Sequence, residues 1–141
     1  MKYVLDSSVA FKWVVPERDS DKADRLRAAY VQGIHELHSP DFFPVEVAHA
    51  LTRAERQNRI PVGDAQSRLI NVLSTAPAFH PYRPLLARAV AISSKMRVGV
   101  YDCVYVALAE SEKCQLVTDD DRLIKTLGPT FPFIIPLSSL P

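Results

Sequence analysis

Short apolar segments alternate with helix-forming segments along this chain, and that alternation limits the choice of fold more than any other feature of the sequence. The strand-like segments are Lys2 to Leu5, Glu36 to Ser39, Leu116 to Thr118 and Phe133 to Ile135. The helix-like segments are Val9 to Val15, Ser20 to Gln32, Phe43 to Arg59, Val62 to Ala76, Leu85 to Lys95, Tyr101 to Lys113 and Asp121 to Leu127. Such a pattern predicts an α/β fold in which helices cover a mostly parallel central sheet.

Serine, glycine and proline residues mark the ends of several predicted helices. Ser7 or Ser8 is placed to cap the first helix. Gly33 stands where a C-cap glycine would end the second. Prolines make continuation of a helix costly, and they separate the fourth helix from the fifth at Pro77, Pro81 and Pro84.

The length of the chain predicts one domain spanning residues 1–141. Two halves of a 15.8 kDa chain would each bury too little surface to be stable. Apolar residues make up 48% and charged residues 23%, which excludes a disordered or fibrous chain. Because the net charge is only +1, a nucleic-acid site would have to depend on local charge or on bound cations.

The cysteines and the hydropathy pattern restrict the class of protein further. Cys103 and Cys114 form no CxxC pair and have no histidine at zinc-finger spacing. This argues against a structural zinc site and favours two free, buried thiols. The chain has no apolar run of about eighteen residues and no basic segment before a long apolar stretch. We therefore expect a soluble, cytoplasmic protein without a membrane partner.

Acidic side chains occur at the positions where a parallel sheet would gather them. Asp6 follows the first strand, the run Asp119 to Asp121 follows a later strand, and Glu46 and Asp102 lie near the starts of two helices. Ligands of parallel sheets bind beyond the carboxyl ends of the strands. Carboxylates gathered there favour Mg²⁺ or Mn²⁺, which prefer oxygen ligands. The chemistry that this predicts is hydrolysis of phosphodiester bonds by metal-activated water.

Each acid also has a simpler structural explanation. Asp6 and the triplet could cap the helices that follow them, and Asp102 could favour a helix N-terminus. Glu46 could be a solvated helix residue. Spacing alone leaves both interpretations open, because it does not show whether the four segments converge.

The segment Val4-Leu5-Asp6-Ser7-Ser8-Val9-Ala10 resembles the opening of a PIN domain, where a hydrophobic strand ends in an Asp followed by Ser or Thr. Three further segments resemble the later acidic segments of that family, in the same order: Pro44-Val45-Glu46-Val47-Ala48-His49-Ala50-Leu51, Tyr101-Asp102-Cys103-Val104-Tyr105-Val106-Ala107-Leu108-Ala109 and Leu116-Val117-Thr118-Asp119-Asp120-Asp121-Arg122-Leu123. The resemblance covers essentially the whole chain. It implies a three-layer α/β/α PIN-like domain.

The resemblance also implies an acidic catalytic pocket formed by Asp6, Glu46, Asp102 and Asp120. It makes Asp6 and Asp102 the direct ligands of Mg²⁺, for which Mn²⁺ can substitute. Ser7 and Thr118 would support these carboxylates.

The short single-domain format is similar to that of VapC-like toxins of type II toxin–antitoxin systems. This likeness implies a Mg²⁺-dependent endoribonuclease with an RNA substrate, a cognate antitoxin protein and a homodimeric state. The alternative is a catalytically silent PIN module that serves as a protein- or RNA-binding scaffold, although such modules often lose pocket acids that this chain keeps. A phosphatase with Asp6 as nucleophile fits less well, because haloacid-type phosphatases carry a second Asp where this chain has Ser8.

Asp120 is the member of the acidic triplet that we expect to face the pocket. It lies two residues after Thr118, in a turn from which its side chain can swing back over the end of the strand. Asp119 is expected to face outward or to brace the turn. Asp121 falls in the first helical turn, where the helix N-terminus stabilises a carboxylate without any catalytic role.

Arg53, Arg56 and Arg59 form a basic stripe along the third predicted helix. A solvated helix face is the common explanation of such a stripe, and contact with RNA phosphates is the alternative. His49 follows Glu46 by one helical turn, and we expect it to be a bystander.

Overall fold

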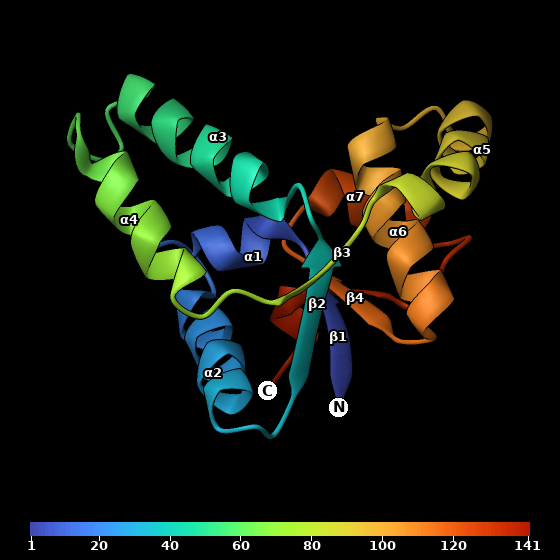
Figure 1. Cartoon of the computed structure of the whole chain (residues 1–141), viewed down its shortest axis with the longest axis horizontal. Helices are drawn as coiled ribbons and strands as arrows, with labels where there is room; N and C mark the ends of the chain where they lie inside the picture. The colour runs from blue at the N-terminus through green and yellow to red at the C-terminus, as the bar shows by residue number, and fades with distance from the viewer.

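A five-stranded, fully parallel β-sheet forms the centre of the molecule in the computed structural model, which describes residues 1–141 (Figure 1). The strands are β1 (Lys2–Leu5), β2 (Glu36–Pro40), β3 (Ala78–His80), β4 (Gln115–Thr118) and β5 (Ile134–Pro136). Their order across the sheet is β3-β2-β1-β4-β5, and every neighbouring pair is parallel. The prediction of an α/β fold with a parallel sheet is confirmed.

Helices cover both faces of this sheet. They are α1 (Ser7–Phe11), α2 (Ser20–Val31), α3 (Phe43–Arg56), α4 (Asp64–Leu73), α5 (Leu86–Met96), α6 (Val100–Glu112) and α7 (Asp121–Leu127), with short 3₁₀ turns η1 (Arg83–Leu85) and η2 (Leu137–Ser139). α1 to α4 pack on one face, and α5 to α7 pack on the other (Figure 1). The three predicted layers are therefore present.

Alternate residues of the central strands supply the two hydrophobic cores. Leu5 and Val117 are buried with α1 to α4, whereas Val4 and Leu116 are buried with α5 to α7. Successive side chains of a strand point to opposite faces, so a strand buried on both faces has to be apolar throughout. This is why the short apolar runs were a reliable signal of strands in this chain.

The carboxyl ends of β1, β2 and β4 lie together at one edge of the sheet, because all strands run in the same direction. The starts of α3 and α6 flank this edge from opposite sides (Figure 1). The fold thus places the four acidic segments of the sequence around one end of the sheet.

The first helix differs from its prediction. α1 begins at Ser7 rather than at Val9, and it ends at Phe11. Asp6 occupies the N-cap position with an extended backbone (φ −72°, ψ 145°), and no side chain caps the helix. The Ser8 hydroxyl, expected as a possible cap, donates instead to the Asp6 carboxylate.

The third and fourth helices are shorter than predicted, and residues with positive φ interrupt the chain between them. α3 ends at Arg56, and Asn58 then adopts a left-handed conformation with φ of 57°. α4 begins at Asp64 after Gly63, whose φ is 97°. Glycine adopts that conformation without the steric penalty that a Cβ would bring.

Strand β3 was not predicted, since it lies within the proline-containing connection between α4 and α5. Pro77 and Pro81 bound this short strand. β3 pairs only with β2 and forms one edge of the sheet, where flanking prolines are tolerated. Three residues are too few to display a period of two, and Phe79 is exposed at 42%.

Two further features concern the state of the cysteines and the apolar character of the helices. Both cysteines are free, as expected, but only Cys103 is buried, and Cys114 is partly exposed. None of the helices combines the length and the apolar character that crossing a membrane requires.

Candidate active site

An open cavity of about 1230 Å³ lies at the carboxyl ends of the strands, between α3 and α6. Its lining includes the predicted acids and one of the two predicted supporting residues: Asp6, Glu46, Asp102, Asp120 and Ser7. The second supporting residue, Thr118, contacts Asp6 from behind, where its hydroxyl donates to the carboxylate. The fold thus brings all six residues together.

Asp6 is the most deeply placed of these acids. It follows β1, its backbone N–H donates to the carbonyl of Val117 on β4 at 3.0 Å, and only 6% of the residue is exposed. Its Oδ2 accepts hydrogen bonds from Ser8 Oγ at 2.5 Å and Thr118 Oγ1 at 2.8 Å. Burial raises the pKa of Asp6 despite these two donors. The carboxylate is fixed in place but lacks the positive partner that a buried charge needs.

Glu46 and Asp102 face this region from opposite sides. Burial raises the pKa of Glu46 to about 7, and the charges of Asp6 and Asp102 add to that rise. The buried Tyr105 hydroxyl donates to Glu46 Oε1 at 2.7 Å. Burial also raises the pKa of Asp102 to about 6, together with the charges of Asp6 and Asp120. Mutually repelling, partly buried carboxylates are characteristic of functional sites rather than of stabilising ion pairs.

The three members of the acidic triplet have different environments. Asp120 caps α7, with Oδ1 accepting from the backbone N–H groups of Arg122 and Leu123 at 3.0 and 3.2 Å. Asp119 Oδ2 forms an ion pair with Lys12 Nζ at 2.9 Å. The Asp121 side chain is 87% exposed. Asp120 and Asp119 line the cavity, whereas Asp121 does not.

Several residues were not assigned from the sequence to the role of holding the acids in place. Ser8 links two of the acidic segments, because its hydroxyl donates to Asp6 and also accepts the N–H of Asp119 at 3.0 Å. Tyr105 orients Glu46, and Lys12 has a side chain that is only 3% exposed beside Asp119. Apart from the bond of Ser8 to Asp6, these contacts join segments far apart in the sequence, so no local pattern marks them.

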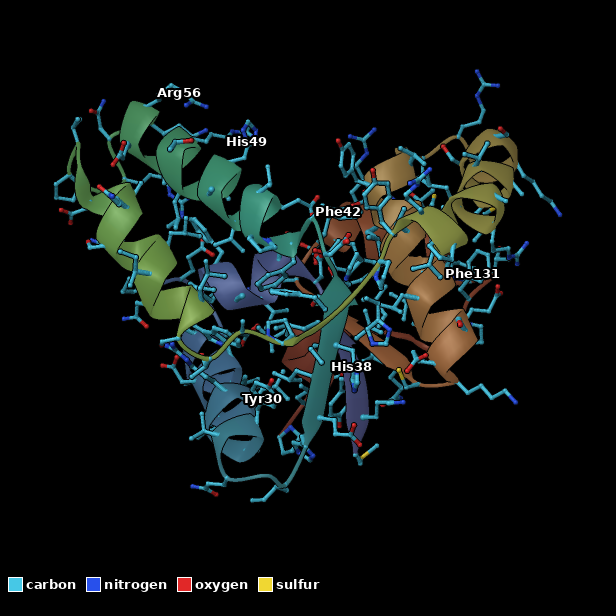
Figure 2. The ribbon with its side chains drawn as sticks, viewed as in Figure 1. Tyr30, His38, Phe42, His49, Arg56 and Phe131 are labelled. Atoms are coloured by element: carbon cyan, nitrogen blue, oxygen red, sulfur yellow. The ribbon has the colours of Figure 1, made fainter.

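The three arginines of the predicted basic stripe differ in their position relative to the cavity. Arg53 and Arg59 line the cavity, whereas Arg56 does not and lies towards the end of α3 (Figure 2). Arg59 is held by an ion pair with Glu17. Arg53 is exposed and takes part in no ion pair. His49, expected to be a bystander, also lines the cavity.

The acidic pocket fits a hard divalent cation. Its donors are carboxylate oxygens, and a positive charge among them would relieve the repulsion that raises their pKa values. No three of these carboxylates offer oxygen atoms that all lie within 4.8 Å of one another. Mg²⁺ is typically held by only one or two protein carboxylates together with several waters. The assignment of Asp6 and Asp102 as ligands stays a prediction.

The raised pKa values predict an unusual dependence of stability on pH. Because Glu46 and Asp102 have pKa values of about 7 and about 6 in the folded chain, the folded state binds more protons than the unfolded state just below neutral pH. The free energy of unfolding therefore falls as pH rises. In EDTA, we expect a loss on the order of 2 kcal/mol between about pH 5 and pH 8, measured by urea denaturation.

The matched control for this experiment is the double variant Glu46→Gln/Asp102→Asn, whose stability should change much less over the same pH range. Mg²⁺ added at the higher pH should restore stability to the unmodified chain and not to the variant. Stability that rises with pH in the unmodified, metal-free chain would contradict the prediction.

Comparisons with known proteins bear on the family to which this chain belongs. The model of the PIN domain family matches residues 3–127. "Ribonuclease VapC3" of Pyrobaculum aerophilum is 35% identical over 125 residues, which cover 87% of this chain and 92% of that protein. "VapC ribonuclease Mb0985" of Mycobacterium bovis is 32% identical over 123 residues, covering 87% and 89% of the two chains.

Two crystal structures share the fold at low sequence identity. PAE2754 from Pyrobaculum aerophilum has a TM-score of 0.70 at 20% identity, with 99% of this chain and 94% of that chain covered. VapBC2 from Rickettsia felis, solved bound to a DNA fragment from its promoter, has a TM-score of 0.64 at 14% identity and covers 96% and 97%. Since the family model spans most of the sequence and the relatives are 35% and 32% identical over most of their length, this chain belongs to the PIN domain family.

Proposed function

We propose that this chain is a Mg²⁺-dependent endoribonuclease, acting in the cytoplasm as the toxin of a VapBC-like toxin–antitoxin pair. The observation that carries the proposal is the convergence of four carboxylates, from Asp6, Glu46, Asp102 and Asp120, in one cavity at the carboxyl end of a parallel sheet. Relatives that are named VapC ribonucleases support the same reaction class. A silent scaffold would have no need to keep this costly cluster of buried charge.

The residues of the pocket have different roles in the proposed reaction. Asp6 and Asp102 would hold Mg²⁺, and Ser8 and Thr118 fix the Asp6 carboxylate in one orientation. When bound, the ion supplies a water of lowered pKa and a positive charge beside the phosphate. Glu46 has a pKa of about 7, so its carboxyl group can take up or release a proton near neutral pH.

The proposal is tested with purified chain and a mixture of structured and unstructured RNAs. We expect cleavage in Mg²⁺ or Mn²⁺ and none in EDTA. The products should carry a 5′-phosphate and a 3′-hydroxyl, because metal-activated water is the nucleophile. Undiminished cleavage in EDTA, or a 2′,3′-cyclic phosphate end, would exclude this mechanism.

Arg53 is the residue that we expect to contact an RNA phosphate beside the pocket. It is exposed, lines the cavity and has no acidic partner, whereas Arg56 on the same helix does not line the cavity. Arg53→Ala should weaken RNA binding by roughly 3- to 10-fold and reduce its salt dependence by about one phosphate contact. Arg56→Ala is the matched control. Equal losses in the two variants, measured by fluorescence anisotropy, would contradict a specific contact at Arg53.

The proposed partner is a cognate antitoxin that reaches the rim of this cavity. The rim is apolar and aromatic on the side of α3 and α6, where Phe42, Val45, Tyr82 and Tyr101 line it. The structural neighbour from Rickettsia felis is a VapBC complex, which supports such a pairing. Co-expression with a short reading frame found directly before this one should give a stable complex in which RNA cleavage is suppressed. Co-expression that yields no complex and leaves cleavage unchanged would exclude that partner.

We also propose that the chain forms a homodimer, as the likeness to VapC-like proteins implies. Apolar side chains left exposed on α4 and in the turn before it, Ile70 at 65% and Val62 at 86%, are consistent with a further interface. Light scattering at micromolar concentration should give twice the chain mass of 15.8 kDa. A mass equal to that of one chain under these conditions would show that it is monomeric.

A further inference from the structure

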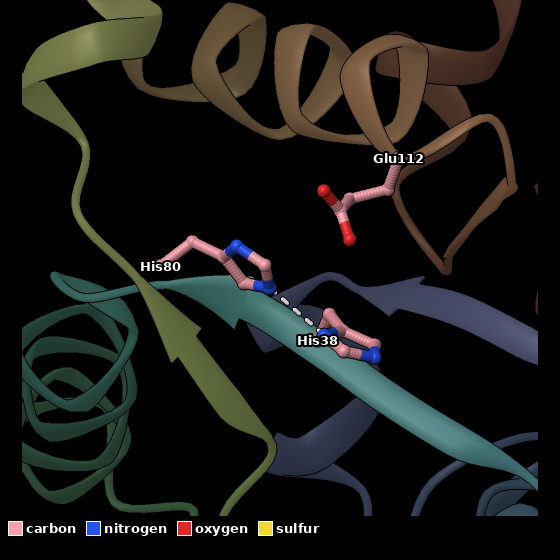
Figure 3. Close-up of side chains that lie close together, drawn as sticks. All are labelled: His38, His80 and Glu112. Atoms are coloured by element: carbon pink, nitrogen blue, oxygen red, sulfur yellow. Dashed lines mark hydrogen bonds between the residues drawn. The ribbon is translucent and has the colours of Figure 1, made fainter.

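A second cluster of metal-ligating side chains lies outside the acidic cavity. It consists of His38 on β2, His80 at the end of β3 and Glu112 at the end of α6 (Figure 3). Each residue offers one ligand atom, and the three atoms all lie within 4.8 Å of one another. None of these residues lines the acidic cavity, so the cluster is a separate feature of the molecule.

The two imidazole rings point their nitrogens at each other. His38 Nδ1 lies 2.8 Å from His80 Nε2, and the other ring nitrogen of His38 lies 3.2 Å from Glu36 Oε1. If Nε2 of His38 donates its proton to Glu36, then Nδ1 presents a lone pair towards His80. Histidine ligands of metals commonly donate their second ring N–H to a carboxylate, which fixes the tautomer and strengthens the ligand. Glu36 therefore stands where an outer partner of a metal-bound His38 would stand.

Glu112 completes the cluster with an ionised carboxylate. Lys2 Nζ donates to its Oε1 at 3.0 Å, and this hydrogen bond lowers the pKa of Glu112. The carboxylate faces both rings in Figure 3. The side chain of His38 is only 12% exposed, whereas that of Glu112 is 24% exposed, so the glutamate has room to adjust.

We propose that His38 Nδ1, His80 Nε2 and a carboxylate oxygen of Glu112 bind a transition-metal ion of the Zn²⁺ class, with water as a fourth ligand. Two imidazoles and one carboxylate are an established ligand set for tetrahedral zinc. Ring nitrogens bound to one tetrahedral Zn²⁺ lie about 3.3 Å apart, so the pair at 2.8 Å has to separate only slightly. The proton that His80 shares with His38 in the metal-free chain then resides on Nδ1 of His80.

The choice of ion separates this site from the acidic pocket. Imidazole ligands favour Zn²⁺, Co²⁺ or Ni²⁺, whereas an all-carboxylate pocket favours Mg²⁺ or Mn²⁺. The two sites can therefore be filled independently. The inference does not depend on the proposed ribonuclease activity, because none of its ligands belongs to the acidic pocket.

The ion would connect three elements that are distant in sequence. His38 and His80 join β2 to the edge strand β3, and Glu112 joins both to the end of α6. β3 is short, is bounded by prolines and pairs with only one neighbouring strand. A ligand that binds only the folded chain stabilises it by mass action. We expect the ion to strengthen this edge of the sheet.

The experiment uses tag-free, EDTA-treated full chain and adds Zn²⁺ alone. Calorimetric titration should give one strong site per chain, and Tm should rise by roughly 5–10 °C at Zn²⁺ about 100-fold above Kd. Co²⁺ should produce the intense visible absorption of a tetrahedral site. NMR of the imidazole rings should show the resonances of His38 and His80 responding, and those of His35 and His49 unchanged.

Three variants separate the possible locations of the ion. His80→Gln should abolish the strong Zn²⁺ site, the Tm rise and the Co²⁺ spectrum, and Glu112→Gln should weaken each of them. His35→Gln is the matched control and should keep them. The double variant Asp6→Asn/Asp102→Asn should also keep them. If the Tm rise is lost in that double variant and persists in His80→Gln, Zn²⁺ occupies the acidic pocket and the proposal is wrong.

Discussion

Replacing Asp6 by Asn is expected to reduce metal-dependent RNA cleavage by at least roughly 100-fold. Losses of 10- to 100-fold are typical when only an outer partner of a metal ligand is removed, and Asp6 is the proposed ligand itself. The change is nearly isosteric and removes one charge. Ser8 and Thr118, which now donate to Oδ2, can still donate to the amide oxygen. Cleavage of a labelled RNA at saturating Mg²⁺ measures the effect.

The stability of this variant distinguishes a chemical loss from a folding defect. Burial raises the pKa of Asp6, which means that its charge is costly in the folded, metal-free chain. Asp6→Asn should therefore be at least as stable as the unmodified chain in EDTA, and it should gain less from added Mg²⁺. Asp121→Asn is a suitable control, because that side chain is 87% exposed and does not line the cavity. Full cleavage activity in Asp6→Asn would contradict the metal-nuclease mechanism.

Strands that are buried on both faces could be predicted from this sequence, whereas the edge strand β3 could not. Val4 and Leu5 both have to be apolar because they face different cores, and this produces a continuous signal. β3 has one neighbouring strand, three residues and two flanking prolines, so its local sequence indicates a loop. Its place in the sheet depends on pairing with β2, which is a tertiary effect.

The same distinction applies to the two clusters of side chains. The acids could be predicted because each follows a strand or begins a helix, and parallel topology gathers such positions. The roles of Tyr105 and Lys12 could not be predicted, since they depend on contacts with Glu46 and Asp119 across the fold, although the position of Lys12 after the first acidic segment places it near the pocket. His38 and Glu112 likewise have no sequence spacing typical of metal ligands. The cysteine pattern argued against a structural zinc site, and that argument did not consider histidines brought together by β2 and β3.

Substitutions in the acidic triplet test which side chain of the turn after β4 acts in the pocket. Asp120 uses Oδ1 to cap α7, and its charge raises the pKa of Asp102 in the pocket. Asn is as good an N-cap as Asp, because its side-chain oxygen accepts the same N–H groups. Asp120→Asn therefore keeps the cap and removes only the charge. We expect cleavage to fall roughly 10- to 100-fold, as for a residue that acts beside the metal ligands, with little change in Tm.

For variants of the two neighbours of Asp120, we expect a change in stability rather than in cleavage activity. Asp119 forms an ion pair with the buried Lys12, so Asp119→Asn should lower the free energy of unfolding by about 1–2 kcal/mol. The loss is limited because Glu17, 3.4 Å from Lys12 Nζ, remains as a partner of that cation. Asp121→Asn loses an exposed charge at a helix N-terminus and a solvent-exposed ion pair with Arg18, together worth about 0.3–1 kcal/mol. Both should retain most of their cleavage activity. A larger loss of cleavage in Asp119→Asn than in Asp120→Asn, with both variants folded by circular dichroism, would mean that Asp119, which already lines the cavity, leaves Lys12 and takes the role assigned to Asp120 when RNA binds.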